Sequence, residues 1–254
     1  MAAPLPTSPD AHPGATPPGA TPPGATPADA TPAGEIAAAK PTKRLSLPAA
    51  IREVASRDPV VAHLVTLAGP ITHRPPDPDG PFGALVSSIV FQQLAGAAAR
   101  AIHQRVRATV AGDLTPTALA AVPDEVLRGA GLSAAKLASL RDLSARVLDG
   151  RVVLAASSRQ SDDDIVAALS TVRGIGRWTA EMYLMFELRR LDVWPVDDLG
   201  VRQGYALAWS LDPPPKAKEL QRLGERFRPY RSIVARYCWE AVHLFRGGTD
   251  PSLR

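Results

Sequence analysis

Along nearly the whole chain after residue 45, apolar residues recur at the three- and four-residue spacing of an amphipathic helix. The sustained alternation of apolar and polar residues that a half-buried strand requires is hard to find. Two runs show the helical spacing well: Phe82, Leu85, Val86, Ile89 and Val90, and then Leu137, Leu140, Leu143 and Val147. The pattern predicts an all-α protein of about ten helices joined mostly by short loops.

The first 45 residues differ in composition from the rest. Eleven of the chain's 26 prolines lie before residue 45, and a Gly-Ala-Thr-Pro-Pro unit that begins at Gly14 is repeated from Gly19. Bulky apolar residues are almost lacking there, so burial would not offset the entropy lost on ordering. We therefore expect 1–45 to be a disordered tail and 46–254 to form a helical domain long enough for a sizeable core.

The small number of cysteines excludes several classes of protein. A single cysteine, Cys238, rules out a disulfide framework, a four-thiolate zinc site and a cysteine-ligated iron–sulfur cluster, and the five scattered histidines do not replace those ligands. No apolar run approaches the ~18 residues of a membrane span, and the N-terminus has no apolar signal core. We expect a cytoplasmic protein with no metal site and no membrane partner, in which Cys238 is a small buried apolar side chain.

Positive charge is concentrated near the C-terminus. The chain carries a formal net charge of +4, and residues 216–246 contain eight basic residues against three glutamates. The basic residues of this segment are Lys216, Lys218, Arg222, Arg226, Arg228, Arg231, Arg236 and Arg246. Such a segment suggests an acidic partner, most often nucleic acid. On charge alone, a solvated helix face in an arginine-rich protein remains an equal alternative.

Residues 169–180 form the most specific local signal: a helix, a four-residue turn bounded by two glycines, and a second helix. Glycines allow positive φ and close approach of the backbone to another surface. With the free amides of the second helix's first turn, they make a pocket of N–H donors for a phosphate oxygen. A helix–hairpin–helix at about 161–188 would therefore bind DNA backbone without reading sequence, although a Gly-x-Gly turn alone also fits a purely structural connection. The expected DNA contacts are Gly174, Ile175, Gly176, Arg177 and Thr179.

Further motifs follow this hairpin at defined spacing. Twenty residues after Trp178, a proline-containing loop ends in Asp197-Asp198, and Asp198 opens the next helix. This arrangement resembles the helix–hairpin–helix DNA glycosylase superfamily, and within it the AlkA-type DNA-3-methyladenine glycosylase II family. Three more segments match that family: 89–94, 131–136, and 228–232 followed by Trp239. The resemblance spans about 80–245 and implies two helical subdomains with an active-site cleft between them.

The resemblance implies an activity and a catalytic residue. Asp198 corresponds to the family's catalytic carboxylate, which stabilises positive charge on the sugar while water attacks. Asp197 ranks second, and an aspartate before a helix is by itself more often only an N-cap. Trp178 stands where the bifunctional members carry a lysine, so the covalent Schiff-base route is unavailable. The resemblance therefore implies a monofunctional hydrolase that removes alkylated purines of the 3-methyladenine and 7-methylguanine type.

Aromatic residues are candidates for the base-binding pocket. Trp178 and Trp239 can stack on an N-alkylated purine, whose positive charge adds cation–π attraction. The alternative, that they are core residues, holds for most helical tryptophans, and we keep it for Trp194 and Trp209. Met182 faces the same way as Trp178, and the AlkA pattern has an aromatic there. Gln92 is a further candidate for substrate binding, and a hydrogen bond from its amide to a neighbouring helix is the alternative.

Some expectations rest on the family alone. Arg231 is expected to contact DNA, and the loop at about 72–81 is expected to carry the side chain that fills the gap left by a flipped base. His73 and Arg74 are both candidates for that plug, and neither is assigned. We expect a monomer that acts on damaged duplex DNA in the nucleoid without a cofactor, although in this family the hairpin carbonyls can hold a monovalent cation. The AlkA type often carries an N-terminal β-rich domain, and we expect the disordered tail in its place here.

Two alternatives to this function remain open at this point. One keeps the enzyme class and changes the lesion to uracil, hypoxanthine or an oxidised purine. The other is a helix–hairpin–helix protein that binds damaged DNA without catalysis, which the spacing from Trp178 to Asp198 opposes.

Overall fold

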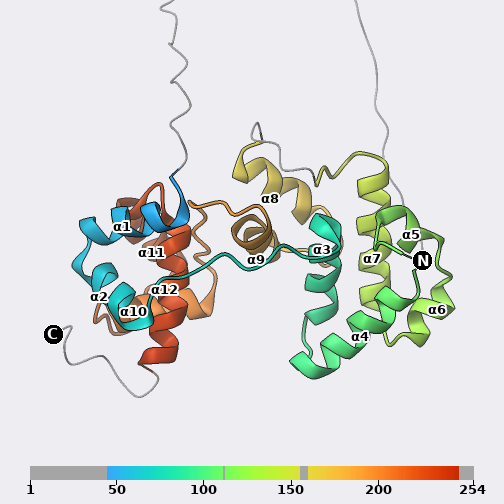
Figure 1. Cartoon of the computed structure of the whole chain (residues 1–254), viewed down its shortest axis with the longest axis horizontal. Coiled ribbons are helices and arrows are strands. Elements are labelled where there is room, and N and C mark those ends of the chain that lie inside the picture. Colours follow the sequence, from blue (N-terminus) through green and yellow to red (C-terminus); the bar gives the residue numbers. More distant parts are fainter. Residues whose placement is uncertain (1–44, 111, 155–159, 246–254) are drawn as a thin grey trace, which may run out of the picture. The chain divides into compact units, whose positions relative to one another are not determined.

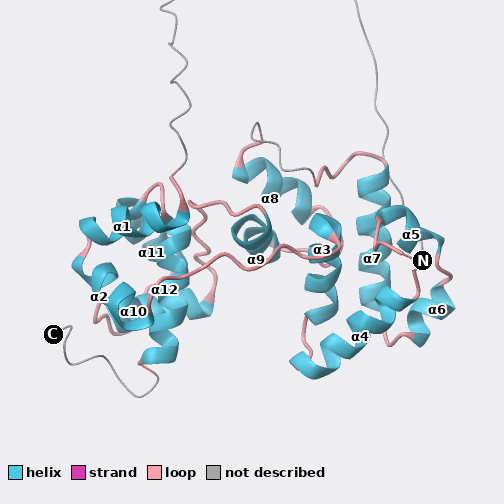
Figure 2. Ribbon diagram, in the orientation of Figure 1, coloured by secondary structure: helices cyan, strands magenta, loops and turns pink. Residues whose placement is uncertain are grey.

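The computed structural model describes residues 45–110, 112–154 and 160–245, and every regular element within these ranges is a helix (Figures 1 and 2). The predicted all-α fold is therefore confirmed. Of the predicted tail, only Leu45 lies within the described residues. The α-helices are α1 (Leu47–Arg57), α2 (Pro59–Ala68), α3 (Gly80–Phe91), α4 (Gly96–Ala108), α5 (Pro116–Ala121), α6 (Asp124–Gly129), α7 (Ala134–Leu148), α8 (Asp162–Ser170), α9 (Arg177–Met182), α10 (Leu199–Ala208), α11 (Ala217–Gly224) and α12 (Arg231–Leu244).

Side-chain caps begin several of these helices where the sequence predicts them. The Ser133 hydroxyl accepts from the Lys136 amide at the start of α7 (3.3 Å), and the Ser161 hydroxyl accepts from the Asp164 amide at the start of α8 (3.1 Å). No helix in the described ranges is long and apolar enough to cross a membrane.

The helix that follows the hairpin differs from the prediction. A single helix from about 176 to 188 was expected, but α9 ends at Met182 and continues as a π-helical turn, η1 (Tyr183–Glu187). The amide of Leu188 donates to the Tyr183 carbonyl, five residues back, at 3.1 Å. A π turn adds one residue to the repeat, which apolar spacing does not reveal, and such turns are frequent at functional sites.

Contacts divide the helices into two groups. Helices α1, α2, α10 and α12 form one group, in which α12 touches both α10 and α2. Helix α11 joins this group through a 3-10 turn, η2 (Glu225–Phe227), which contacts α12. Helices α3 to α7 form the second group, in which α7 contacts α3, α5 and α6 (Figure 1). The hairpin pair α8–α9 joins the second group where η1 contacts α3. These are the two helical subdomains that the family resemblance implies.

An aromatic cluster fills the core of the first group. Tyr205 of α10 stacks on Trp209, with ring centroids 4.2 Å apart, and Trp209 lies 5.6 Å from Phe227. Trp194 is only 5 % exposed and meets Tyr205 edge-on at 6.3 Å. The prediction that Trp194 and Trp209 are core residues is thus confirmed.

The backbones of α10 and α12 touch at one glycine. A Cβ on Gly204 would lie 1.8 Å from the carbonyl oxygen of Cys238, so no larger residue fits without separating the two helices. This close approach brings the start of α10 beside the middle of α12.

We predict that Gly204→Ala lowers the free energy of unfolding by about 1–3 kcal/mol, because overpacking a tight contact forces the backbones apart. Chemical denaturation with a circular-dichroism readout measures this change. The matched control is Gly129→Ala, where nothing lies within 4 Å of the added methyl group. Equal stability of the two variants would contradict the prediction.

Candidate active site

The turn between α8 and α9 is fixed against α7. Gly174 has a φ of +77°, which L side chains rarely adopt, and a Cβ there would lie 2.5 Å from the Ser139 hydroxyl oxygen of α7. The Asp142 carboxylate of α7 accepts from the Arg173 amide at 2.7 Å. This N–H, together with the neighbouring Arg146 guanidinium, lowers the pKa of Asp142. The hairpin therefore has a defined shape before any ligand binds.

Gln92 ties the same turn to α3. Its side-chain amide donates to the Gly174 carbonyl at 2.9 Å. Gln92 lines neither of the cavities described below, so the structure does not place it at the expected base site. Its side chain bonds the hairpin turn, whereas the alternative left open by the sequence was a bond to a neighbouring helix. An otherwise exposed turn carbonyl gains a hydrogen-bond partner in this way.

The first turn of α9 presents amides to solvent. Gly176 is the N-cap and supplies no side chain to cap them, and first-turn amides have no acceptor within their own helix. Gly174, Gly176 and Arg177 are exposed, as expected for residues that contact DNA.

The remaining two expected contacts, Ile175 and Thr179, are buried. The Ile175 side chain is 3 % exposed, and its amide donates to the Val172 carbonyl at 3.1 Å inside the turn. Thr179 is 6 % exposed and lines a cavity. The Ile175 amide is thus used within the turn, and the first-turn amides of α9, that of Thr179 included, stay the predicted donors for a phosphate.

A second anchored loop delivers Asp198 to the start of α10. The Val193 amide donates to the Ser232 hydroxyl of α12 (2.8 Å), and the Trp194 indole N–H donates to the Leu220 carbonyl of α11 (2.8 Å). Because both contacts come from one helical group, the position of Asp198 is set by the packing of that group.

The carboxylate of Asp198 accepts three N–H groups. Oδ1 accepts from the Val201 amide at 2.8 Å and from the Trp239 indole at 2.9 Å. Oδ2 accepts from the Trp178 indole at 2.6 Å. Asp198 is thus an N-cap, and it is also bracketed by the two tryptophans that the sequence singled out. A carboxylate has about four acceptor sites, so Oδ2 keeps one for a further partner.

Trp239 reaches Asp198 because the second residue of α10, Gly200, has no side chain. A Cβ on Gly200 would lie 2.8 Å from Cδ1 of the Trp239 indole. On its other side Trp239 stacks on Phe186 of η1, with ring centroids 5.9 Å apart and planes 21° apart. The α12 and η1 elements, distant in sequence, therefore share one aromatic stack beside the carboxylate.

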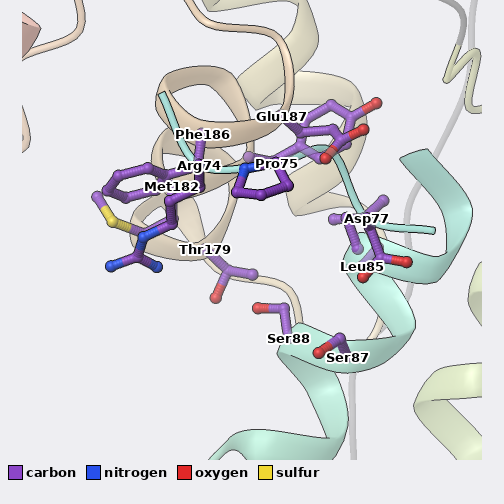
Figure 3. A pocket seen from close by; sticks show the side chains of 12 residues that line it. Arg74, Pro75, Asp77, Leu85, Ser87, Ser88, Thr179, Met182, Phe186 and Glu187 are labelled. Carbon is purple, nitrogen blue, oxygen red and sulfur yellow. The ribbon is translucent and has the colours of Figure 1, made fainter. Parts of the chain in front are cut away.

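Two adjoining cavities lie along this stack. One, of about 320 Å³, is lined by Arg74, Trp178, Met182, Phe186 and Trp239. The other, of about 280 Å³, shares Arg74, Met182 and Phe186 with the first and extends toward α3 (Figure 3). We call the first the aromatic cavity and the second the hydroxyl cavity, because Ser87, Ser88 and Thr179 line it. Met182 lies where the sequence predicts, between the two.

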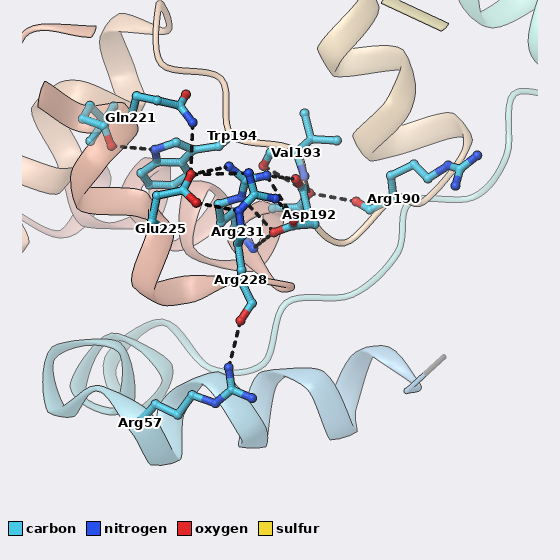
Figure 4. Close-up of polar contacts among 11 residues, drawn as sticks. Arg57, Arg190, Asp192, Val193, Trp194, Gln221, Glu225, Arg228 and Arg231 are labelled. Atoms are coloured by element: carbon cyan, nitrogen blue, oxygen red, sulfur yellow. Dashed lines mark hydrogen bonds and ion pairs between the residues drawn. The ribbon is translucent and has the colours of Figure 1, made fainter. Parts of the chain in front are cut away.

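Arg231 is enclosed by protein. It is 7 % exposed, and its guanidinium bonds the Asp192 carboxylate at 2.8 and 3.0 Å and the Asp192 carbonyl at 3.0 Å (Figure 4). Glu225 adds a 3.3 Å contact. The expected DNA contact is corrected: Arg231 fastens the start of α12 to the loop that leads to Asp198.

The basic segment 216–246 is also less available than its composition indicates. Arg226 pairs with Asp58, Arg228 pairs with Asp192 and Glu225, and Arg231 is enclosed as above. Arg246 lies outside the described residues. Three of the eight basic residues are therefore held in internal ion pairs, which neither a nucleic-acid face nor a solvated helix face predicts.

The two candidate aspartates, Asp197 and Asp198, differ in burial. Asp197 is exposed, whereas Asp198 is partly buried against the indoles, which favours Asp198 for the chemistry.

Cys238 is 0 % exposed, and burial raises the pKa of its thiol well above the usual range. It is the buried apolar side chain that we predicted. Among the residues that the structure describes, no group of three or more His, Cys, Asp or Glu side chains is placed to hold a metal ion.

Comparison with known proteins identifies the family. Residues 86–229, more than half of the chain, match the model of the HhH-GPD superfamily base excision DNA repair proteins. The chain belongs to this superfamily. The matched range contains the hairpin, Trp178, Asp198 and most of both cavities.

Similar proteins share a name. DNA-3-methyladenine glycosylase 1 of Schizosaccharomyces pombe is 32 % identical over 167 residues, which cover 65 % of this chain and 73 % of the relative. The solved DNA-3-methyladenine glycosidase of Bacillus halodurans is 35 % identical with a TM-score of 0.69, covering 76 % of this chain and 88 % of that one. The S. pombe 3-methyladenine DNA glycosylase in complex with abasic DNA gives 30 % identity and a TM-score of 0.65, covering 77 % and 97 %.

Sequence reasoning did not assign Phe186 to the site. The signal was present, since Trp178, Met182 and Phe186 follow one another at four-residue intervals on one helical face. The sequence pattern could not predict that both indoles hydrogen-bond the same carboxylate, because Trp239 lies on a helix 41 residues beyond Asp198.

We predict that Trp239→Phe slows base removal by this superfamily member about tenfold, because the ring stack is kept while one N–H donor to Asp198 is lost, an effect of about 1.4 kcal/mol. Single-turnover kinetics on a lesion duplex measures the rate, and DNA affinity should not change.

Trp209→Phe is the matched control, since the Trp209 indole N–H is buried without a hydrogen-bond partner in the described part of the chain. Wild-type rates in both variants would argue against a role for the Trp239 N–H.

Proposed function

We propose that the protein is a monofunctional DNA glycosylase that hydrolyses the N-glycosidic bond of alkylated purines, of the 3-methyladenine and 7-methylguanine type, in duplex DNA. The observation that carries this proposal is the Asp198 carboxylate, bracketed by the Trp178 and Trp239 indoles at the aromatic cavity. The names of two similar proteins support it: the DNA-3-methyladenine glycosylase 1 of S. pombe and the DNA-3-methyladenine glycosidase of B. halodurans.

The chemistry needs one anion close to the sugar. Loss of the base builds oxocarbenium character on the deoxyribose, and a fixed carboxylate stabilises that charge without reorganising. The three donors to Asp198 fix its orientation, and the remaining acceptor site of Oδ2 is available to the attacking water or to the sugar.

The aromatic cavity suits a cationic leaving base. N-alkylation makes the purine positively charged, so the faces of Trp178, Trp239 and Phe186 attract it more than they attract a normal base. The same charge makes the base a good leaving group, so a strong general acid is not required. This fits the aromatic cavity, which among the described residues is lined by three aromatic rings and no acidic residue, while two of those rings hydrogen-bond the Asp198 carboxylate.

Strand cleavage is not expected from this site. The bifunctional route needs an amine that attacks the sugar, and no lysine lines the aromatic cavity or the hydroxyl cavity. Lys136 instead donates to the Val90 carbonyl at the end of α3 (2.8 Å). The product would be an abasic site in an intact strand.

Duplex DNA would be held by its backbone. The exposed amides around Gly176 and Arg177 point to a phosphate contact without base readout. A monovalent cation, where bound, would use carbonyls of the same turn and add positive charge beside that phosphate. We further propose that the protein acts as a monomer on chromosomal DNA and that the hydrolysis itself requires no cofactor.

Release of methylated purines from alkylated duplex DNA tests the proposal. The wild-type protein should release free base, with strand breaks appearing only after alkali, and Asp198→Asn should slow release by about 100-fold or more because the negative charge is lost. Asp197→Asn is a matched control and should act like the wild type, since Asp197 is exposed.

Other outcomes of this assay would replace the proposal. Release only from duplexes that contain uracil, hypoxanthine or an oxidised purine would change the substrate. DNA binding without release of any base would indicate a binding protein.

For residues 1–45 we predict that deletion leaves the rate of base excision unchanged, because the site is built entirely from residues beyond them. Comparing full-length and truncated protein in the same assay measures this. A large loss of activity with an unchanged melting temperature would show that the segment takes part in catalysis or DNA binding.

A further inference from the structure

An arginine side chain lies over the ring of Phe186, which lines the aromatic cavity. The guanidinium carbon of Arg74 lies 4.7 Å from the centroid of the Phe186 ring, and Arg74 lines both cavities. Figure 3 shows Arg74, Met182 and Phe186 together at one end of the hydroxyl cavity. A guanidinium is planar and positively charged, so it offers Phe186 the same cation–π interaction that an N-alkylated purine would.

The backbone on both sides of Arg74 is fixed, whereas its side chain is not. The Tyr237 hydroxyl donates to the Gly69 carbonyl at 3.1 Å, and the Arg236 guanidinium donates to the Thr72 carbonyl at 2.7 Å. Beyond Arg74, the Asp79 amide donates to the Asp77 carboxylate at 2.9 Å. In the described part of the chain, no hydrogen bond or ion pair holds the Arg74 guanidinium, whose residue is exposed.

A second cation beside the same ring opposes this position of Arg74. The Arg236 guanidinium carbon lies 5.9 Å from the Phe186 centroid. Burial, together with the positive charge of Arg74, lowers the pKa of Arg236. Arg236 is fastened to Thr72, so of the two cations Arg74 is the one that can leave.

We propose that Arg74 is a specificity-determining residue that covers the Phe186 face in the DNA-free protein and that the flipped base must displace it. The proposal rests on the proposed function in that the aromatic cavity is the base site. A base that enters competes with Arg74 for the ring, so its apparent affinity is reduced by the fraction of protein in which the face is covered. Any Arg74 charge left nearby also opposes a cationic base more than a neutral one.

Binding of free nucleosides isolates this effect from catalysis and from the duplex. Tryptophan fluorescence would follow titration of the full-length, DNA-free protein with 7-methylguanosine, kept cationic at mildly acidic pH, and with neutral guanosine. Arg74→Met should bind 7-methylguanosine about tenfold more tightly than the wild type, or ~1.4 kcal/mol. Guanosine affinity should rise by a smaller factor, because only the competition is removed. Arg74→Lys, which keeps the charge but not the planar fork, should fall between.

Two controls make the result specific. Arg52→Met removes an exposed arginine of α1 and should leave both affinities unchanged. In a Phe186→Leu background, Arg74→Met should have a clearly smaller effect, because the ring that the guanidinium covers is absent. Thermal melting of each variant checks that it is folded.

Unchanged or weaker binding of 7-methylguanosine to Arg74→Met would overturn the proposal, and so would an equal gain in the Phe186→Leu background. Failure of either nucleoside to bind any variant would also overturn it. The proposed function is judged separately by base release from DNA, so a covered face in a protein that releases no alkylpurine would leave this inference standing while the substrate assignment fails.

Discussion

The contact between α10 and α12 at Gly204 determines the geometry of everything around Asp198. With the two backbones in contact, the N-terminus of α10 lies beside the middle of α12. Gly200, one turn earlier, leaves room for the Trp239 indole against the carboxylate. Because neither glycine has a side chain, the Asp198 carboxylate and the Trp239 ring, which lie on separate elements, come within hydrogen-bond distance. The rigidity comes from close packing, which tolerates little change in volume.

Charge in this protein is used in two different ways. Three arginines of the C-terminal segment are paired internally: Arg231 and Arg228 with Asp192, and Arg226 with Asp58. These pairs set the path of the loop that ends at Asp198. Asp198 itself is held by uncharged N–H donors and has no basic residue bonded to it among the described residues. An anion supported by dipoles keeps its full charge available to a developing cation, whereas a salt bridge would have neutralised it.

The sequence was sufficient for the helices and the hairpin, and it singled out residues that the structure brings together at the candidate site. Helical spacing is a local property of the sequence. Asp198, Trp178 and Met182 likewise lie in short motifs that can be read from neighbouring residues. The errors share a physical cause. Gln92 and Arg231 were assigned by motif position, but their partners, the Gly174 carbonyl and Asp192, are 82 and 39 residues away. The spacing of residues in the sequence does not predict such long-range contacts. It also does not predict the extra residue of the π turn before Leu188.

The single thiol of the chain lies directly behind this machinery. Cys238 supplies the carbonyl that meets Gly204, it is fully buried, and both its burial and the nearby Asp198 charge raise the pKa of its thiol. The thiolate is the form of cysteine that electrophiles attack, so this side chain offers almost none of it. Methylating agents that damage DNA react with exposed thiolates by the same displacement chemistry. Burial of this thiol therefore protects the contact between α10 and α12, and with it the position of Asp198, from the class of reagent that creates the proposed substrates.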